Sequence, residues 1–390
     1  MNGKWIVKSE VSENKDFIDA LNDLFVKIAK HKNVLRIVLF GNPNDNNEYL
    51  NHLSIANNLL SKYFSLNAPI LSYVAQKPLG GVSLAAEFHI LDVNDKVSTS
   101  YLSYNNTKYI RIDGENESQL ILGGIQASNI DLDVKSQSDE AFETVYAIFE
   151  KENFRINSIV RQWNYLENIT GIIDNKQIYQ EFNDSRSEFY SKESWEKGYP
   201  SATGIGMSNG GMVIDINAVA VLNDRVTVEP IDNRLQISAH DYSKNILVGE
   251  KNKNKTTPKF ERAKCVYQIN EKPENFCNGN LYISGTAAIR GEHSISKNDI
   301  KEQTIVTIEN INELVNENNR LLKNRNISEC SNLSYLRVYI KNEQDYYSAN
   351  EILKSIFPTI DIAYVKADVC RDELLIEIEG VGNINGGLES

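Results

Sequence analysis

Hydrophobic and polar positions follow a helical period in the first ninety residues of the chain. Apolar residues recur there every three or four positions, and one stripe consists of Phe17, Leu21, Leu24, Phe25 and Ile28. A similar pattern covers residues 48–64. Such stripes are typical of amphipathic helices that pack one face against a core. An apolar run that starts at Val34 separates the two stripes and predicts a buried strand.

From residue 83 onward strand-like alternation dominates, and one order of elements occurs twice. The first copy has an apolar run, a helix, a strand, a helix and a strand, at residues 120–125, 138–153, 156–168, 178–190 and 211–220. The second copy repeats this order at residues 281–286, 299–319, 333–342, 346–357 and 373–381. Two copies of one unit predict an α+β fold, with a pocket between the copies.

The repeat also predicts the domain organisation. We expect one domain over residues 1–222, with a helical N-terminal extension, and a second over residues 223–390, which begins with a connector. When the two copies are aligned, Arg161 falls opposite Arg337 and Asp215 opposite Glu377.

The closing strand of the second copy carries two carboxylates on one face. Residues 368–380 are DVCRDELLIEIEG, and strand alternation puts Glu377 and Glu379 opposite the face of Ile376 and Ile378. Taken alone, this pattern favours a solvent-facing or paired Glu377, and a Glu379 that pairs with a cation at the strand end. A pocket beside this face would instead give the carboxyls a chemical role.

Composition excludes some classes of function. The chain has 390 residues, 41% of them hydrophobic, and a net charge of −12 with a pI near 5.1. An acidic chain is unsuited to sequence-independent binding of nucleic acid. No stretch approaches the roughly 20 apolar residues of a membrane span. Because the first residues also lack the apolar core of a leader peptide, we expect a cytoplasmic protein with no membrane partner.

The sequence offers no metal-binding or cofactor-binding motif. Its four cysteines and five histidines are scattered without the spacing of a zinc site. Neither a Walker A phosphate loop nor a Gly-x-Ser-x-Gly nucleophile elbow occurs. We therefore predict no metal and no organic cofactor.

Several segments, in this order and spacing, resemble the chorismatases, enzymes that cleave chorismate for secondary metabolism. They include RQWNYLENI, YQEFNDSRSEFY, YPSATGIG, PKFERA, YISGTAAIRGEHS, LRVYIKN and DVCRDELLIEIEG, which span most of residues 156–380. The closing strands are also similar to those of the Rid/YjgF family of small α+β domains. The resemblance implies two tandem Rid/YjgF-like (chorismate-mutase-like) α+β units in a pseudo-oligomeric arrangement, and we expect a monomer.

The resemblance implies that the chain cleaves the enol ether of chorismate to pyruvate and a hydroxybenzoate. It also implies that Glu377 is the general acid that protonates the methylene carbon of the enolpyruvyl group. In water a Glu has a pKa of about 4.3 and is ionised at neutral pH, whereas burial lets it hold its proton.

Two positions of the family bear on the product. Hydroxybenzoate-forming chorismatases resemble this chain in having Cys at the position of Cys370, whereas the dihydrodiol-forming hydrolases have Ala there. This similarity favours 3-hydroxybenzoate, with 4-hydroxybenzoate as the other hydroxybenzoate product. The second position corresponds to Ala287, to within one residue, and its Ala is less typical of the hydroxybenzoate-forming type.

Chorismate is a dianion, so its site requires cations. Arg262 in PKFERA is the first candidate, followed by Arg371 and Arg337, although strand alternation alone favours a surface ion pair for Arg337. Tyr242 matches an aromatic-rich connector of the family and is a candidate donor to a substrate oxygen. We expect one active site formed by the second copy and the connector. The first copy is expected to serve as a scaffold that retains only remnants of the charged residues.

Two other functions stay open. A Rid-type imine or enamine deaminase would share the strand pattern, but residues 359–365 offer no Arg to hold its substrate. A noncatalytic module that binds a small ligand would keep the fold without the chemistry.

Overall fold

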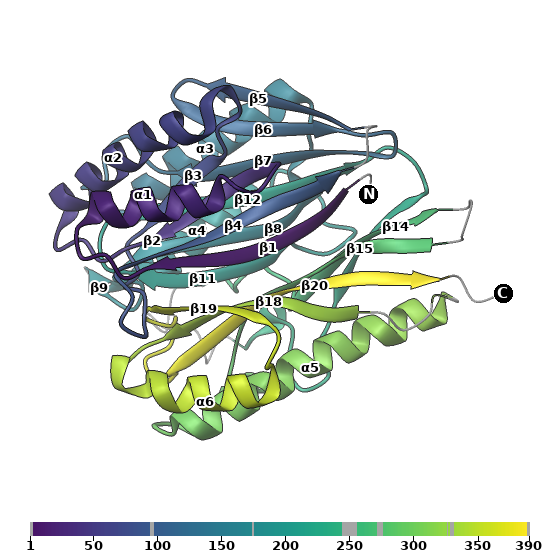
Figure 1. The fold of residues 1–390 in the computed structure, drawn as a ribbon. Helices are drawn as coiled ribbons and strands as arrows, with labels where there is room; N and C mark the ends of the chain where they lie inside the picture. The colour runs from purple at the N-terminus through teal and green to yellow at the C-terminus, as the bar shows by residue number, and fades with distance from the viewer. Residues whose placement is uncertain are drawn as a thin grey trace.

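The computed structural model describes residues 3–93, 97–173, 175–243, 256–270, 276–325, 327 and 331–387. Within these residues the chain forms three large β-sheets, each packed against its own helices (Figure 1). We call the three parts unit one, unit two and unit three, in chain order. No helix among the described residues is long and apolar enough to cross a membrane.

Unit one covers residues 3–93. Its elements are β1 (Gly3–Ser12), α1 (Phe17–Ile28), β2 (Val34–Phe40), α2 (Asn46–Phe64), η1 (Ser65–Asn67), β3 (Ile70–Val74) and β4 (Leu84–Val93). The strands lie in the order β1-β4-β2-β3, with β2 and β3 parallel and the other pairs antiparallel. The stripe predicted for the first helix faces the core, because Leu21, Leu24, Phe25 and Ile28 of α1 are buried.

Unit two covers residues 98–221. Its elements are β5 (Ser98–Tyr104), β6 (Thr107–Asp113), β7 (Glu117–Ile125), α3 (Val134–Glu152), η2 (Ile156–Ser158), β8 (Ile159–Glu167), β9 (Ile172–Ile173), β10 (Lys176–Gln177), α4 (Ile178–Tyr190), β11 (Ser201–Met207) and β12 (Met212–Val221). The large sheet has the order β11-β8-β12-β7-β6-β5, and β9 and β10 form a small hairpin.

Unit three covers residues 226–387. Its elements are β13 (Val226–Ile231), η3 (Ala239–Asp241), β14 (Ala263–Asn270), β15 (Phe276–Ala287), β16 (Ile289–Arg290), β17 (His293–Ser294), α5 (Ile300–Asn324), β18 (Ser331–Ile340), η4 (Glu343–Asp345), α6 (Tyr346–Ile356), β19 (Asp361–Lys366) and β20 (Ile376–Gly387). The large sheet has the order β13-β14-β15-β20-β18-β19.

All three units follow one plan of strand, helix, strand, helix, strand and strand. Their four core strands lie in equivalent orders, namely β1-β4-β2-β3, β7-β12-β8-β11 and β15-β20-β18-β19. The two predicted copies are units two and three. The first ninety residues, expected as a helical extension, form a third and shorter copy. Of its strands, β2 is buried along its whole length and was visible as an apolar run, whereas the burial of β1 is patchy along its length.

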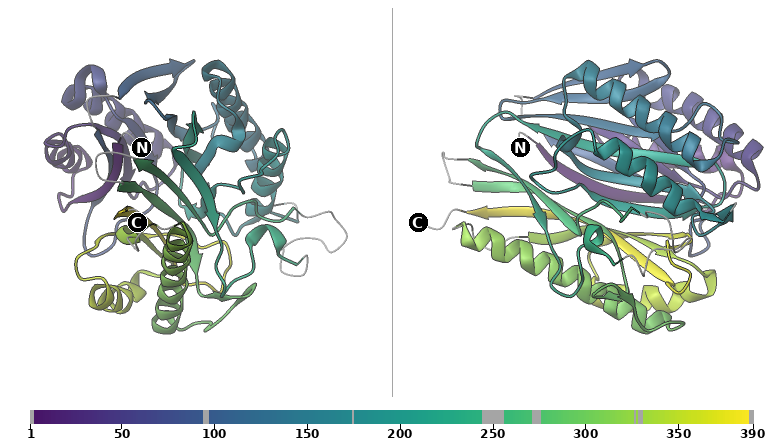
Figure 2. Two further views of the ribbon diagram at one scale, coloured as in Figure 1. Left: turned by 90° about the vertical axis from the view of Figure 1, so that its right-hand side faces the viewer. Right: turned by 180° about the vertical axis from the view of Figure 1, so that it is seen from behind.

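The three units close into a ring within the one chain. The β3 edge of unit one contacts β7 of unit two, the β11 edge of unit two contacts β15 of unit three, and the β19 edge of unit three contacts β1 of unit one. Figure 2 shows the helices on the outside of this ring and the strands within it. A contact repeated head to tail closes into a ring when the rotation allows it, so the fold has an approximate threefold pseudo-symmetry.

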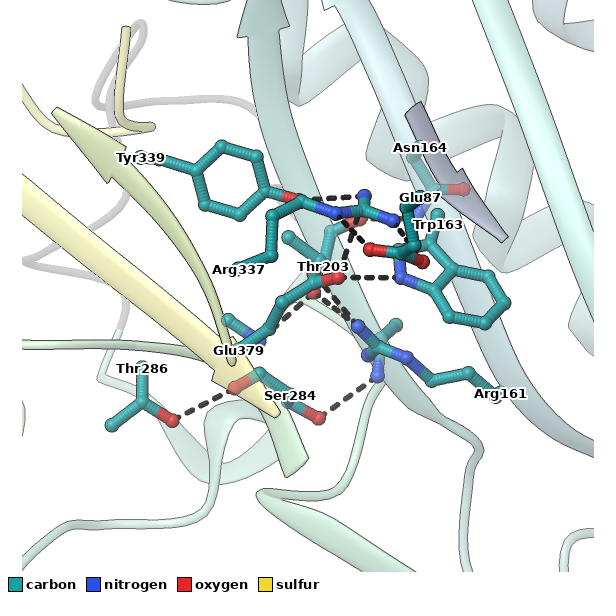
Figure 3. A network of polar contacts seen from close by, with 12 residues as sticks. Glu87, Arg161, Trp163, Asn164, Thr203, Ser284, Thr286, Arg337, Tyr339 and Glu379 are labelled. Carbon is teal, nitrogen blue, oxygen red and sulfur yellow. Dashed lines mark hydrogen bonds and ion pairs between the residues drawn. The ribbon is translucent and has the colours of Figure 1, made fainter. Parts of the chain in front are cut away.

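One arginine of each unit reaches into the next unit. Arg36 of β2, Arg161 of β8 and Arg337 of β18 occupy the same position in their sheets, and each is at most 2% exposed. Arg36 donates to two carbonyl oxygens of unit two at 2.7 and 2.9 Å. Arg161 donates to Glu379 of unit three at 2.8 Å, and Arg337 donates to Glu87 of unit one at 2.8 Å (Figure 3).

The position of Arg337 differs from both predictions made for it. We expected either a substrate-binding group or a surface ion pair, but the side chain is fully buried between units. Its guanidinium pairs with Glu87 and donates to the hydroxyl oxygens of Tyr165 and Tyr339 at 2.6 and 3.0 Å. Strand alternation predicts which residues share a face, but it does not predict that another sheet covers that face.

We predict that Arg337→Met destabilises the protein by about 3–5 kcal/mol, because it leaves the buried Glu87 carboxylate without its guanidinium. The measurement is the shift of the urea unfolding midpoint. The matched control is Lys77→Met, which removes an exposed ion pair with Glu343 and should cost less than about 1 kcal/mol. Equal shifts for the two variants would contradict the structural role of Arg337.

Candidate active site

A cavity lies between units two and three, with an empty volume of about 840 Å³ that includes solvent at its mouth. Helix α4 and strand β11 of unit two line one wall, and the other wall comes from unit three. The residues that line it include Tyr179, Asn183, Arg186, Tyr242, Arg262, Ala287, Cys370, Arg371 and Glu377. Interfaces between units are common places for ligand sites.

Glu377 lies on β20 at the inner wall of this cavity. It is in register with Ala287 of β15 and Tyr339 of β18, and its side chain is buried. A Cβ atom on Gly285 would lie 1.9 Å from Glu377 Oε1, so the missing side chain of glycine makes room for the carboxyl. In the part of the chain that the structure describes, this carboxyl has no hydrogen-bond or ion-pair partner.

The environment of Glu377 favours its protonated form. Burial, followed by the negative charge of Glu379, raises the pKa of Glu377 to about 8, against the opposing effects of Arg161 and Arg262. A carboxyl with a pKa just above neutrality carries a proton at neutral pH and can still give it up, as a general acid must.

Two buried guanidinium groups, Arg262 and Arg186, line the same cavity. Arg262 donates to the carbonyl oxygen of Ile237 at 2.7 Å and to the Tyr242 hydroxyl oxygen at 2.5 Å. Arg186 donates to Asn183 Oδ1 at 2.6 Å. Within the described residues, the Nε atom of each is buried without an acceptor, and neither arginine has a carboxylate partner. Both therefore keep hydrogen-bonding capacity and positive charge for an anionic ligand.

Arg371 and Cys370 lie on the loop that precedes β20. Arg371 donates to the Glu292 carbonyl oxygen at 2.9 Å, and its guanidinium lies 5.4 Å from the Tyr242 ring centre. Burial, and then the nearby Glu377, raises the pKa of Cys370 to about 12, so the sulfur is present as a neutral thiol. Burial likewise raises the pKa of Tyr179 above its ordinary value and keeps its hydroxyl neutral.

Most of the residues proposed from the sequence meet in this cavity. Glu377, Cys370, Arg262, Tyr242, Arg371 and Ala287 all line it, and Arg337 does not. Unit two is more than the expected scaffold, because α4 supplies Tyr179, Asn183 and Arg186. The segment YQEFNDSRSEFY could have indicated this, because Arg186 is its one cationic residue and stands among aromatic residues.

The pseudo-symmetry relates Glu377 to one acidic residue in each of the other two units. Glu87, Asp215 and Glu377 occupy equivalent positions in the three units. Asp215 accepts hydrogen bonds from the Ser72 hydroxyl at 2.7 Å and from the Gly124 N–H at 2.8 Å. Glu87 pairs with Arg337 and His89. Among the described residues, Glu377 is thus the member of this set whose carboxyl has no polar partner.

No group of three or more His, Cys, Asp or Glu side chains in the described part of the chain is arranged to hold a metal ion.

Comparison with known proteins assigns the chain to a family. The sequence profile described as "Chorismatase FkbO/Hyg5-like, N-terminal" matches residues 98–220, which is unit two. A 3-hydroxybenzoate synthase of Streptomyces hygroscopicus is 30% identical over 247 residues, which are 62% of this chain and 67% of that protein. The chain belongs to the chorismatase family.

The chain also matches a further curated relative and a solved structure. The chorismatase of Streptomyces rapamycinicus is 28% identical over 228 residues, which are 57% of this chain and 64% of that protein. A chorismatase crystal structure superimposes with a TM-score of 0.70 and 18% identity, and the match covers 98% of this chain and 99% of that one. The chorismatase fold therefore extends over all three units, and the predicted α+β class with repeated units is confirmed.

We predict that Glu377→Gln stabilises the protein more strongly as the pH rises. The folded protein holds the proton of Glu377 up to a pH of about 8, whereas an unfolded Glu releases it near 4.5. The wild type therefore loses stability through this window by up to about 1.4 kcal/mol per pH unit, and the variant does not. Urea unfolding at several pH values measures the difference.

The control for this titration is Glu351→Gln, which changes an exposed carboxyl on α6 and should show no such pH trend. A stability difference between wild type and Glu377→Gln that stays constant from pH 5 to pH 8 would contradict a proton-bearing Glu377.

Proposed function

We propose that this chorismatase cleaves the enol ether of chorismate to pyruvate and a hydroxybenzoate, with 3-hydroxybenzoate as the favoured product. The observation that supports this proposal is a buried, unpartnered Glu377, with a pKa raised to about 8, in a cavity that also holds two buried guanidinium groups, Arg186 and Arg262, without carboxylate partners. The similarity to a 3-hydroxybenzoate synthase of Streptomyces hygroscopicus supports the same reaction.

The first step needs an acid that can protonate carbon. Glu377 transfers its proton to the terminal methylene carbon of the enolpyruvyl group, which becomes a methyl group, and the ether oxygen then stabilises the adjacent cation as an oxocarbenium ion. Glu377 becomes a carboxylate in this step. Arg161 and Arg262 lower the pKa of Glu377 and favour this charged form. Their effect keeps the pKa close enough to neutrality for Glu377 to release its proton.

Arginines on opposite walls of the cavity can bind the two carboxylates of the substrate. Arg186 lies on α4 of unit two, and Arg262 lies directly before β14 in unit three. Each guanidinium can bind a carboxylate through parallel hydrogen bonds, and low exposure strengthens such contacts. Tyr242, which accepts from Arg262, has a hydroxyl hydrogen to donate to a substrate oxygen.

Cys370 and Ala287 are the proposed product-controlling residues. Both line the cavity with Glu377, and Ala287 pairs with it across β15 and β20. A neutral thiol beside the ring occupies space that a hydrolytic water would need, which favours attack by the ring hydroxyl on the oxocarbenium ion. Pyruvate then leaves, and an arene-oxide-like intermediate rearomatises to the hydroxybenzoate.

We predict that the purified protein forms pyruvate and 3-hydroxybenzoate from chorismate in metal-free buffer. Glu377→Gln should lower the rate roughly 10²–10⁴-fold, because it removes the general acid and keeps the shape of the side chain. Pyruvate is quantified enzymatically and the aromatic products by chromatography. Glu351→Gln serves as the control and should keep the wild-type rate.

The outcomes of this experiment separate the functions. Formation of the dihydrodiol or of 4-hydroxybenzoate would keep the reaction class and overturn the product. Wild-type turnover in Glu377→Gln would remove Glu377 from the role of acid. Absence of pyruvate with a folded protein would reject chorismate cleavage, and imine hydrolysis would then be the reaction to test.

We predict that Cys370→Ala shifts the product mixture from hydroxybenzoate toward the dihydrodiol, because the smaller side chain admits water beside the ring. The ratio of the two products, at equal pyruvate yield, is the measurement. Cys265→Ala is the control, since this cysteine is buried in the core of unit three outside the cavity. An unchanged ratio in Cys370→Ala would rule out control of the product by the thiol.

A further inference from the structure

Glu379 lies two residues beyond Glu377, on the same face of β20, at the interface of the three units (Figure 3). One of its oxygens accepts from Arg161 Nη2 at 2.8 Å, and the other accepts from Trp163 Nε1 at 2.8 Å. Arg337 Nη1 lies 3.4 Å from the second oxygen. All of these partners are donors, so the carboxyl group of Glu379 is bound as an anion.

We infer that Glu379 is a positioning residue for the reaction proposed above, and that its fixed negative charge keeps Glu377 in the proton-bearing form and sets the upper pH limit of turnover. This inference rests on the proposed function. Glu379 does not line the cavity and acts only through Glu377.

The distance along the strand supports an electrostatic role. Residues two apart on a strand are separated by about 7 Å, and their side chains point to the same side. Little water intervenes, since Glu377 and Glu379 are 5% and 4% exposed. Two carboxylates at this separation repel each other, so the one without a cation keeps its proton. Consistent with this, Glu379 is the largest cause after burial of the raised pKa of Glu377.

The charges around the pair identify which carboxyl is ionised. The titratable and charged groups that face Glu377 are Tyr179 and Arg186 of α4, Arg262 before β14, Cys370 and Arg371 of the loop, Arg161 of β8, and Glu379 itself. Those around Glu379 are Arg161 and Tyr165 of β8, Arg337 and Tyr339 of β18, and Glu87 and His89 of β4. The direct ion pairs belong to Glu379, and Glu377 has none.

Glu87 is the second anion of the cluster around Glu379. Burial raises the pKa of Glu87, but Arg337 and His89 together hold it well below its usual value. Burial lowers the pKa of His89, which favours its neutral form. The anions Glu87 and Glu379 thus offset the cations Arg161 and Arg337. Loss of the Glu379 charge would leave an excess of positive charge, which also favours ionisation of Glu377.

Arg161 links the same cluster to the backbone beside Glu377. Its Nη2 also donates to Thr203 Oγ1 at 2.7 Å (Figure 3). That oxygen accepts from the Gly285 N–H at 3.0 Å. Gly285 is the residue that makes room for the Glu377 carboxyl. Replacing Arg161 would therefore disturb geometry as well as charge, whereas Glu379→Gln changes the charge and keeps the shape.

The test is the pH dependence of kcat for pyruvate formation in Glu379→Gln. The wild type should lose activity as the pH rises through about 8, since Glu377 then loses its proton. In the variant we expect this alkaline limit to move to lower pH by about one unit. Glu379→Asp, which keeps the charge, should keep the wild-type limit. A role in structure alone would lower kcat at every pH without moving the limit, and that result would overturn the inference.

A measurement without turnover separates this inference from the proposed function. The carboxylic-acid C=O stretch of Glu377, assigned by infrared difference against Glu377→Gln, reports its titration directly. A midpoint that falls in Glu379→Gln supports the inference even if chorismate is not cleaved, and an unchanged midpoint rejects it. If Glu379→Gln does not fold, the paired variant Glu379→Gln with Arg161→Gln leaves no new unpaired charge. It should move the midpoint in the same direction by less, and an unmoved midpoint would again overturn the inference.

Discussion

The architecture depends on three buried arginines, each of which extends from one unit into the next. Arg36, Arg161 and Arg337 have equivalent positions, but their acceptors are backbone carbonyl oxygens, Glu379 and Glu87 respectively. A buried guanidinium is costly unless it is paired and hydrogen-bonded, so each unit requires acceptors that only its neighbour supplies. The guanidinium groups therefore meet their inter-unit acceptors only when all three units have closed.

The same constraint gives the three equivalent acidic residues different surroundings. Asp215 and Glu87 are held by donors or cations of a neighbouring unit, and this leaves Glu377 as the described member of the set with a carboxyl that no polar group satisfies. A buried carboxyl without a hydrogen-bond partner destabilises the fold, so favourable contacts elsewhere in the ring must offset it. Local destabilisation of this kind is common at active sites, because a catalytic side chain must be free to interact with the substrate.

The interior cluster and the cavity differ in net charge. The interior cluster of Glu87, Glu379, Arg161 and Arg337 is neutral as a whole, whereas the cavity has Arg186 and Arg262 without carboxylate partners. The cavity can therefore attract an anion while its acid stays protonated. The arginines pair with Glu87 and Glu379 and not with Glu377. Two neighbouring glutamates on one strand therefore differ in charge, because Glu379 is bound as an anion and Glu377 holds its proton.

The sequence by itself determined the repeated units, the face shared by Glu377 and Glu379, and the family resemblance, because strand period and segment order are local properties of the chain. Only the tertiary structure decided that Arg337 is interior, that Arg186 of unit two lines the cavity, and that the first ninety residues form a third unit. The partners of Arg337, for example, come from other units: Tyr165 lies 172 residues away in the chain and Glu87 lies 250 residues away. Which of several equivalent carboxyls remains unpaired is therefore settled by the closure of the ring, since the donors that satisfy the others are brought in by neighbouring sheets.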